Sequence, residues 1–323
     1  MIDIMAMHFA DRLTEAVVGR RTPVMVGIDP RWESLPSALT TGLDSKNWQD
    51  VAIGFMRFSH AVIDVVAPLV GVVKPQAAFF EQLGPAGMVA LGDVVKYATD
   101  RGLLVVLDGK RNDIGTTAAA YAEAYLGSRP ASAWGADALT VSPYLGDDSL
   151  TPFVDVASAR GAGVFVLVKT SNPGGKTFQD LVVTDESTTG ANKLKLYQKV
   201  AAHVEQLAAS TQGTCGYGCV GAVVGATYPQ QLVELRASMP HTWLLVPGYG
   251  AQGGTARDVD AAFDSRGLGA VINNSRGIIF AHSTPRYRDR FGEARWQDAI
   301  EAATRDMIDE LGSQPNAGKL RAS

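Results

Sequence analysis

The stretch VVLDGKRNDIGTT, residues 105–117, places an acid, a base and a second acid directly after an apolar run. Asp108 and Lys110 are two residues apart, so on a strand both side chains would point to the same side. Charges at the end of a buried strand need partners or a ligand, because removing them from water is costly. An acid and a base held together can stabilise developing charge and move a proton. Asp113 lies beyond the strand, so the spacing does not tie it to the same site.

Other apolar runs of the chain also end in polar side chains. The relevant residues are Asp29, Lys74, Thr170, Ser171, Asn172, Asn274, Ser275 and Arg276. A single acid–base pair would more often be a structural salt bridge than a functional one. Four ionisable groups on three runs, namely two aspartates and two lysines, favour function instead. Alternating charges keep each lysine protonated and each aspartate ionised before a substrate arrives.

Two segments near the C-terminus have the composition of an anion site. They are PGYGAQGG, residues 247–254, and NNSRGII, residues 273–279. Glycines let backbone N–H groups approach an anion, and Arg276 can add a bidentate contact. The chain has no histidine pair at metal-binding spacing, no G-x-S-x-G and no Walker motif. The residues by themselves therefore indicate chemistry without a cofactor or metal on a small phosphorylated molecule.

The elements that must position these residues alternate between β-rich runs and helical patterns. The expected strands span residues 24–30, 71–80, 103–110, 138–144, 164–172, 221–227, 242–250 and 269–277. The expected helices span 55–66, 85–100, 116–125, 148–159, 193–210, 229–238 and 255–263. Nearly continuous apolar runs are typical of parallel strands buried on both faces. The pattern predicts an α/β fold, a single-domain (β/α)₈ TIM barrel, in which the carboxyl ends of the strands share one site. A doubly wound open sheet is the alternative, although no G-x-G-x-x-G segment supports it.

The barrel domain is expected to cover residues 1–312, followed by a disordered tail over residues 313–323. Two insertions interrupt the alternation, one over residues 31–50 and one over residues 173–192. The second insertion, PGGKTFQDLVVTDESTTGAN, is interpreted as a long polar loop and a candidate lid.

Composition limits the partners and the location. The net charge of −4 and the scattered basic residues give no support for a nucleic-acid partner. No apolar run approaches the roughly 20 residues that a membrane span needs, so no membrane partner is expected. The N-terminal residues MIDIMAMHFADRL carry acids where a signal peptide needs bases, and they indicate a first amphipathic helix. A cytoplasmic location follows by default. Cys215 and Cys219 are expected to be reduced thiols without a chemical role.

The motifs together resemble the orotidine 5′-phosphate decarboxylase family. The strand-three signature D-x-K-x-x-D is present from Asp108 to Asp113, and the family's strand-one aspartate and strand-two lysine are matched by GIDP and VVKPQAAFFE. The further matching positions are Asp29, Lys74, Ile114, Thr117, Ser171 in SNPG, Gln252 and Arg276. The matches keep their order from residue 24 to about residue 280, and the length and insertions resemble the longer bacterial-type branch.

The resemblance implies conversion of orotidine 5′-phosphate to UMP and CO₂ in de novo pyrimidine biosynthesis, with neither metal nor cofactor. Lys110 would lie beside C6 of the pyrimidine, stabilise the carbanion left by CO₂ and protonate it. Asp108 would lie near the substrate carboxylate, and Lys74 would link Asp108 to the ribose. Asp29 would bind a ribose hydroxyl.

The resemblance also assigns binding roles and a second subunit. Ser171 would contact the pyrimidine, Gln252 would belong to the lid, and Arg276 would hold the phosphate. A homodimer with shared active sites is implied, because the aspartate matching Asp113 reaches the partner's site in this family. The residues matching Ile114 and Thr117 reach the partner's site together with that aspartate.

Three other functions are open on the same residues. A sugar-phosphate decarboxylase or synthase of the same barrel group would need Mg²⁺ and an acidic ligand on strand two, where this chain has Lys74. A Schiff-base aldolase would use Lys74 or Lys110 as its nucleophile. A catalytically silent barrel that binds a phosphorylated ligand would keep the site without turnover.

Overall fold

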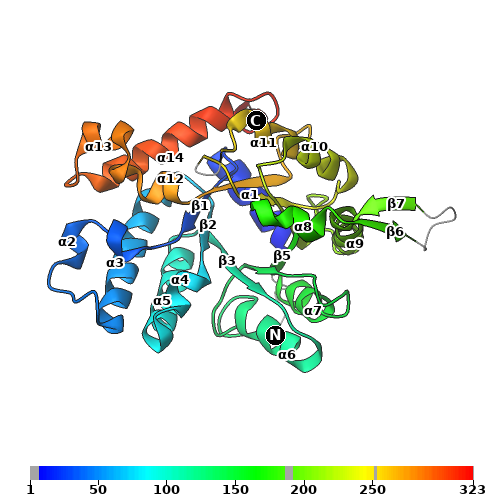
Figure 1. Cartoon of the computed structure of the whole chain (residues 1–323), viewed down its shortest axis with the longest axis horizontal. Coiled ribbons are helices and arrows are strands. Elements are labelled where there is room, and N and C mark those ends of the chain that lie inside the picture. The colour runs from blue at the N-terminus through cyan, green and yellow to red at the C-terminus, as the bar shows by residue number, and fades with distance from the viewer. Residues whose placement is uncertain (1–6, 186–191, 251–252, 323) are drawn as a thin grey trace.

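The computed structural model describes residues 7–185, 192–250 and 253–322, and it contains a closed barrel of parallel strands (Figure 1). The strands follow the order β1-β10-β9-β8-β5-β4-β3-β2, and β1 pairs with β10 to close the barrel. They are β1 (Val24–Ile28), β2 (Val72–Pro75), β3 (Leu104–Arg111), β4 (Ala138–Val141), β5 (Gly163–Lys169), β8 (Val220–Val224), β9 (Leu244–Val246) and β10 (Ala270–Asn274). Closure confirms the predicted TIM barrel and rules out the open sheet.

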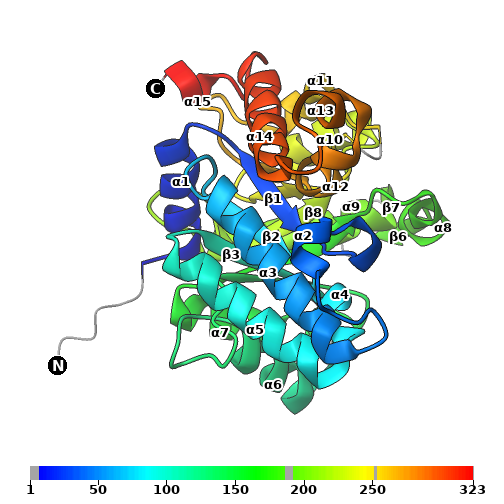
Figure 2. The same cartoon turned by 90° about the vertical axis from the view of Figure 1, so that its left-hand side faces the viewer.

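Helices cover the outside of the barrel, and α3 and α5 run beside each other along one flank (Figure 2). The longer helices are α1 (Phe9–Arg20), α3 (Trp48–Val66), α5 (Gly84–Asp100), α6 (Gly115–Tyr125), α7 (Thr151–Arg160), α9 (Leu196–Ser210), α10 (Pro229–Ser238) and α14 (Trp296–Gly312). The shorter ones are α2 (Ser37–Thr40), α4 (Ala77–Glu81), α8 (Lys176–Gln179), α11 (Ala256–Val259), α12 (Arg276–Ile279), α13 (Pro285–Phe291) and α15 (Lys319–Ala322). Within the described residues, none of these helices is both long and apolar enough to cross a bilayer.

Helix α3 illustrates how the sequence produces this outer layer. Asn47 caps its first turn by accepting a hydrogen bond from Gln49 N at 2.9 Å. Phe55, Phe58 and Val62 recur at helical spacing and are buried against the barrel. The opposite side of the helix carries the polar residues, so the spacing alone determines which face points inward.

The insertion over residues 173–192, expected to be a long polar loop, contains regular secondary structure in its described residues. It contains α8 and the strand β6 (Val182–Asp185), which pairs antiparallel with β7 (Asn192–Lys195). The hairpin projects from the barrel in Figure 1. The β-branched run at residues 182–184 favours a strand, and pairing satisfies the backbone groups of both strands. The expected helix over 193–210 consequently begins only at Leu196.

The expectation of a disordered tail over residues 313–323 is wrong for the described part of the tail. Asn316 N and Ala317 N each donate to Asp260 Oδ1 at 3.0 Å, and α15 follows. Ala317 and Leu320 are buried. The local composition is polar, but the side chains of Ala317 and Leu320 pack against the barrel. The carboxylate of Asp260 accepts hydrogen bonds from the backbone N–H groups of the turn that precedes α15. These are contacts with distant residues, which local composition does not reveal.

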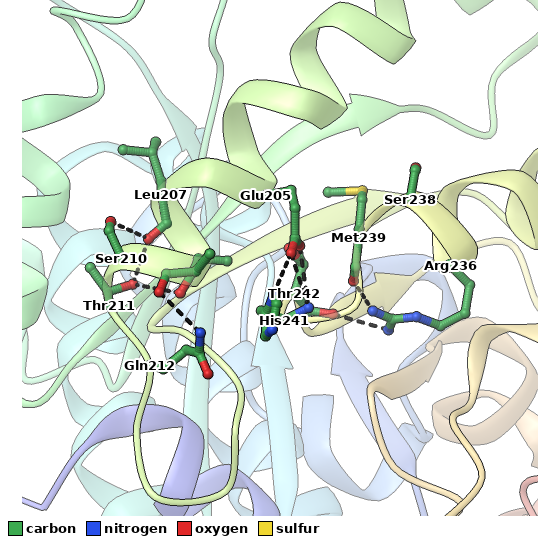
Figure 3. A network of polar contacts seen from close by, with 12 residues as sticks. Glu205, Leu207, Ser210, Thr211, Gln212, Arg236, Ser238, Met239, His241 and Thr242 are labelled. Carbon is green, nitrogen blue, oxygen red and sulfur yellow. Dashed lines mark hydrogen bonds and ion pairs between the residues drawn. The ribbon is translucent and has the colours of Figure 1, made fainter.

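A polar network holds α9 and α10 against the starts of β9 and β10 (Figure 3). Glu205 on α9 accepts from Thr242 Oγ1 at 2.7 Å and lies 2.6 Å from His241 Nδ1. Arg236 on α10 donates to the carbonyl oxygens of Thr242 and Gly269, each at 3.0 Å. The network lies at the amino ends of the strands, where barrels are stabilised, and opposite the end where the candidate site lies.

Candidate active site

The charged carboxyl end of β3 has an unusual backbone. The pairing of β3 with β4 shifts register between Leu107 and Arg111, and Lys110 lies in the left-handed region with a φ of 45°. Such a conformation is strained for a lysine and is retained only where surrounding contacts hold it. One such contact is the hydrogen bond from Lys110 N to Thr140 Oγ1 on β4, at 2.9 Å.

Asp108 is the centre of a network of four donors. Its Oδ1 accepts from Lys110 Nζ at 2.6 Å and from Thr140 Oγ1 at 2.9 Å. Its Oδ2 accepts from Lys74 Nζ at 2.6 Å and from Gln76 Nε2 at 2.9 Å. Both lysines therefore contact the same carboxylate, one on each oxygen. The acid and the bases lie together at the strand end because their opposite charges offset the free-energy cost of removing each of them from water.

The electrostatics of the network keep Asp108 and Lys74 charged. Burial alone would raise the pKa of Asp108, but the charges of Lys74 and Lys110 outweigh burial and hold it well below its usual range. Burial alone would likewise lower the pKa of Lys74, but the charges of Asp108 and Asp29 raise it. Asp108 is therefore an anion and Lys74 a cation at neutral pH, before any ligand binds.

A cavity of about 280 Å³ opens over this network at the carboxyl ends of the strands. Its lining is Asp29, Lys74, Gln76, Asp108, Lys110, Thr140, Leu167, Thr170, Ser171, Asn172, Val223, Leu245, Pro247 and Asn273. Asp29 Oδ1 and Asn273 Oδ1 are buried and have no hydrogen-bond partner among the described residues. Buried acceptors without partners are rare, so both oxygens are suited to receive hydroxyl or amide donors of a ligand.

Seven of the residues singled out in the sequence meet in this cavity: Asp29, Lys74, Asp108, Lys110, Thr170, Ser171 and Asn172. They come from β3 and from the ends of β1, β2 and β5, and a closed parallel barrel brings those ends together.

Other predicted site residues lie outside the lining. Asp113 is half-buried, and its Oδ1 accepts from Ile114 N at 2.9 Å. Ile114 and Thr117 are exposed, with Ile114 56% accessible. Arg276 starts α12 after β10 and is exposed at the same end of the barrel. Gln252 lies outside the described residues.

Gln76 and Thr140 are members of the network that the sequence interpretation missed. Gln76 comes two residues after Lys74 and therefore shares its side of the strand, a signal that was present in VVKPQ. Thr140 interrupts the apolar strand ALTV, and a hydroxyl in a buried strand requires a partner. Neither residue is charged, so the pattern of ionisable groups in the sequence does not indicate either of them.

The arrangement does not resemble a metal centre. Among the described residues, no three histidine, cysteine, aspartate or glutamate side chains are grouped as metal ligands. On β2, where the Mg²⁺-dependent alternative needs an acid, the ammonium group of Lys74 contacts Asp108 instead. The cavity is thus that of a barrel enzyme whose own lysines supply the positive charge.

Residues 22–287 match the sequence model of the orotidine 5′-phosphate decarboxylase/HUMPS family. The chain belongs to this family. It is 55% identical over 307 residues to the orotidine 5′-phosphate decarboxylase of Rhodopirellula baltica, covering 94% of this chain and 99% of the relative. The corresponding enzyme of Deinococcus radiodurans is 42% identical over 278 residues, covering 86% of this chain and 91% of the relative.

Solved structures give the same result for the fold. The OMP decarboxylase of Leishmania donovani superposes with a TM-score of 0.72 at 32% identity, covering 98% of this chain and all of that one. A crystal structure from Streptomyces avermitilis superposes with a TM-score of 0.77 at 36% identity, covering 96% and 97%. The similarity extends over the whole barrel.

Proposed function

We propose that the cavity converts orotidine 5′-phosphate to UMP and CO₂, with the Lys74–Asp108–Lys110 network carrying the chemistry. Decarboxylation as the activity of this chain follows from its family and from 55% identity over nearly its whole length. The residue roles are proposed from one observation: the buried carboxylate of Asp108 accepts hydrogen bonds from Lys74 Nζ and Lys110 Nζ, each at 2.6 Å. A field of this kind, organised before the substrate binds, stabilises charge that develops in a transition state.

The exposures of the two lysines separate their roles. Both lysines line the cavity, but the Lys74 side chain is only 4% exposed and is bonded to Oδ2 of Asp108, whereas the Lys110 side chain, bonded to Oδ1, is 46% exposed. Lys110 is therefore the proton donor of the proposal. Heterolysis of the C6–carboxylate bond releases CO₂ and leaves the electron pair on C6, and a proton from Lys110 Nζ completes UMP. Solvent returns a proton to the exposed amine. Asp108 would face the departing carboxylate.

Binding contacts follow from the remaining lining. The unpartnered Asp29 Oδ1 suits a ribose hydroxyl, and Ser171 at the end of β5 suits the pyrimidine. Arg276, at the same end of the barrel, would hold the phosphate together with Gln252. Remote contacts of this kind supply binding energy for steps at the reacting centre.

The proposal includes a homodimer with shared active sites. Asp113 is adjacent to the network in sequence but absent from the lining of its own cavity. The exposed apolar side chain of Ile114 next to it, together with Thr117, supports a role against a second subunit. A cytoplasmic location, with no nucleic-acid or membrane partner, completes the proposal.

A single assay tests the function. Orotidine 5′-phosphate is incubated with the protein, and the loss of orotate absorbance is followed with and without EDTA. Turnover that is insensitive to EDTA supports the proposal. Turnover that requires Mg²⁺ would support the sugar-phosphate branch, and tight UMP binding without turnover would indicate a silent barrel.

Arg276→Ala is expected to weaken UMP binding by about 10- to 150-fold, because a charge-assisted bidentate contact contributes about 1.5–3 kcal/mol. Uridine lacks the phosphate and should keep its affinity to within about twofold. Calorimetry on both ligands measures the difference, with Arg288→Ala, an exposed arginine of α13, as the control. Equal losses for UMP and uridine would remove Arg276 from the phosphate site.

Thr140→Val is expected to lower kcat about 10- to 100-fold while UMP still binds. The substitution keeps the shape but removes the hydroxyl that accepts from Lys110 N and donates to Asp108. Loss of a hydrogen bond to a charged group costs about 1.5–3 kcal/mol, and it would also release the strained backbone at Lys110. Thr140→Ser should restore most of kcat. A valine variant with the kcat of wild type would show that the bridge has no role in catalysis.

A further inference from the structure

Lys169 is a buried lysine that the proposed mechanism does not use. It is the last residue of β5, its side chain is 1% exposed, and it is absent from the cavity lining. The pairing of β5 with β8 shifts register between Leu167 and Lys169. Nζ lies 5.3 Å from the centre of the Tyr197 ring and 5.1 Å from that of Tyr228. A lysine enclosed in this way requires a specific counter-charge.

That counter-charge comes from the insertion after β5. Lys169 Nζ donates to Asp180 Oδ1 at 2.9 Å, and Lys195 lies 3.8 Å from the same oxygen. Asp180 directly follows α8, so the ion pair fixes the far end of this short helix to the end of β5. Because Lys169 is buried, its attraction to Asp180 is screened less by solvent than the attraction within a fully exposed ion pair.

A second contact lies next to the ion pair. Gln179 Oε1 accepts from Thr170 N at 3.0 Å, and Gln179 Nε2 donates to Thr170 Oγ1 at 2.8 Å. Thr170 Oγ1 in turn donates to Asn172 Oδ1 at 2.6 Å. The contacts between residues 169 and 180 and between residues 170 and 179 therefore join the two ends of the segment 169–180 and close it into a loop. We call the residues that form this closure, Lys169, Gln179 and Asp180, the loop clasp.

The clasped segment carries part of the cavity wall. Three of its residues line the cavity, namely Thr170, Ser171 and Asn172. In the chain they lie between Lys169 on one side and Gln179 and Asp180 on the other. On the barrel side, Thr227 Oγ1 donates to the Ser171 carbonyl at 3.2 Å. Gly225 approaches closely, because a Cβ there would lie 2.8 Å from Ser171 Cα. Two sets of contacts thus restrain this part of the wall: Gln179 holds Thr170, and Thr227 and Gly225 contact the neighbouring Ser171.

We infer that Lys169, Gln179 and Asp180 are positioning residues that hold Thr170 and Ser171 against the base of the substrate. The inference rests on the proposed function for the identity of that base. None of the three touches the reacting atoms. Their effect should therefore appear in recognition of the pyrimidine, with the phosphate end of the ligand unaffected.

Gln179→Met is the principal test, because it keeps the side-chain length and removes both hydrogen bonds to Thr170. The affinity for UMP should fall on the order of tenfold, as expected for one or two lost hydrogen bonds. The affinity for ribose 5-phosphate, which lacks the base, should stay within about twofold. Both are measured by direct binding, and Thr177→Val, an exposed position of the same helix, is the matched control.

Lys169→Met and Asp180→Asn test the other side of the clasp. Each should raise KM for orotidine 5′-phosphate more than it lowers kcat, and the double variant should lose no more than the worse single one. Thermal unfolding is recorded for every variant. Equal losses for UMP and ribose 5-phosphate, unchanged UMP affinity, or losses that follow Tm alone would overturn the inference. Because UMP binding needs no turnover, failure of this test is separable from failure of the decarboxylation assay.

Discussion

Lys110→Ala is expected to lower turnover of orotidine 5′-phosphate by at least about a thousandfold, through loss of both the proton donor and the charge beside C6. Lys74 cannot replace it, because its ammonium group is buried on the other oxygen of Asp108. UMP should still bind, since the product has lost the carboxylate that Asp108 would oppose. A coupled measurement of kcat and UMP affinity checks both parts.

Lys96→Ala serves as the control for Lys110→Ala. Lys96 is an exposed lysine of α5 that pairs with Asp100 one turn away, and its removal should leave kcat unchanged. Circular dichroism establishes that both variants are folded. Residual turnover on the order of a tenth of wild type in Lys110→Ala would show that another group protonates C6.

A mixture of Lys110→Ala and Asp113→Asn chains is expected to recover activity that neither variant has alone. If Asp113 serves the partner's site, a mixed dimer has one site with both lesions and one intact site. Random exchange makes about half of the dimers mixed, so activity should reach roughly a quarter of wild type in a closed two-fold assembly. Subunit exchange is followed independently with differently tagged chains.

The same mixture also tests the alternative, in which Asp113 belongs to the active site of its own chain. If Asp113 completes the cavity of its own chain, every site in the mixture carries one lesion and activity stays near zero. The geometry within one chain favours the first outcome, because Asp113 is outside the lining and its Oδ1 accepts from Ile114 N. A mixture that stays inactive after exchange has been verified would contradict the shared site.

Much of the architecture was predictable from local sequence. Eight apolar runs with helical segments between them indicate a parallel sheet covered by helices on both faces, since strands of that composition must be buried on both sides. Their number favours a closed barrel, and the structure excludes the open sheet that remained as the alternative. Once the barrel is closed, residues at the carboxyl ends of its strands converge. The meeting of Asp29, Lys74, Asp108 and Ser171 follows from their positions in the chain.

Only the tertiary structure decided how those residues touch. The left-handed turn at Lys110 depends on the register between β3 and β4, and Thr140 meets Asp108 because of that register. The packing of the tail around Asp260 and the clasp between Lys169 and Asp180 also join groups that local propensity treats separately. Periodicity reports which face of an element is buried. It does not report which side chain of another element occupies the space opposite, because that is set by the relative placement of whole strands and helices.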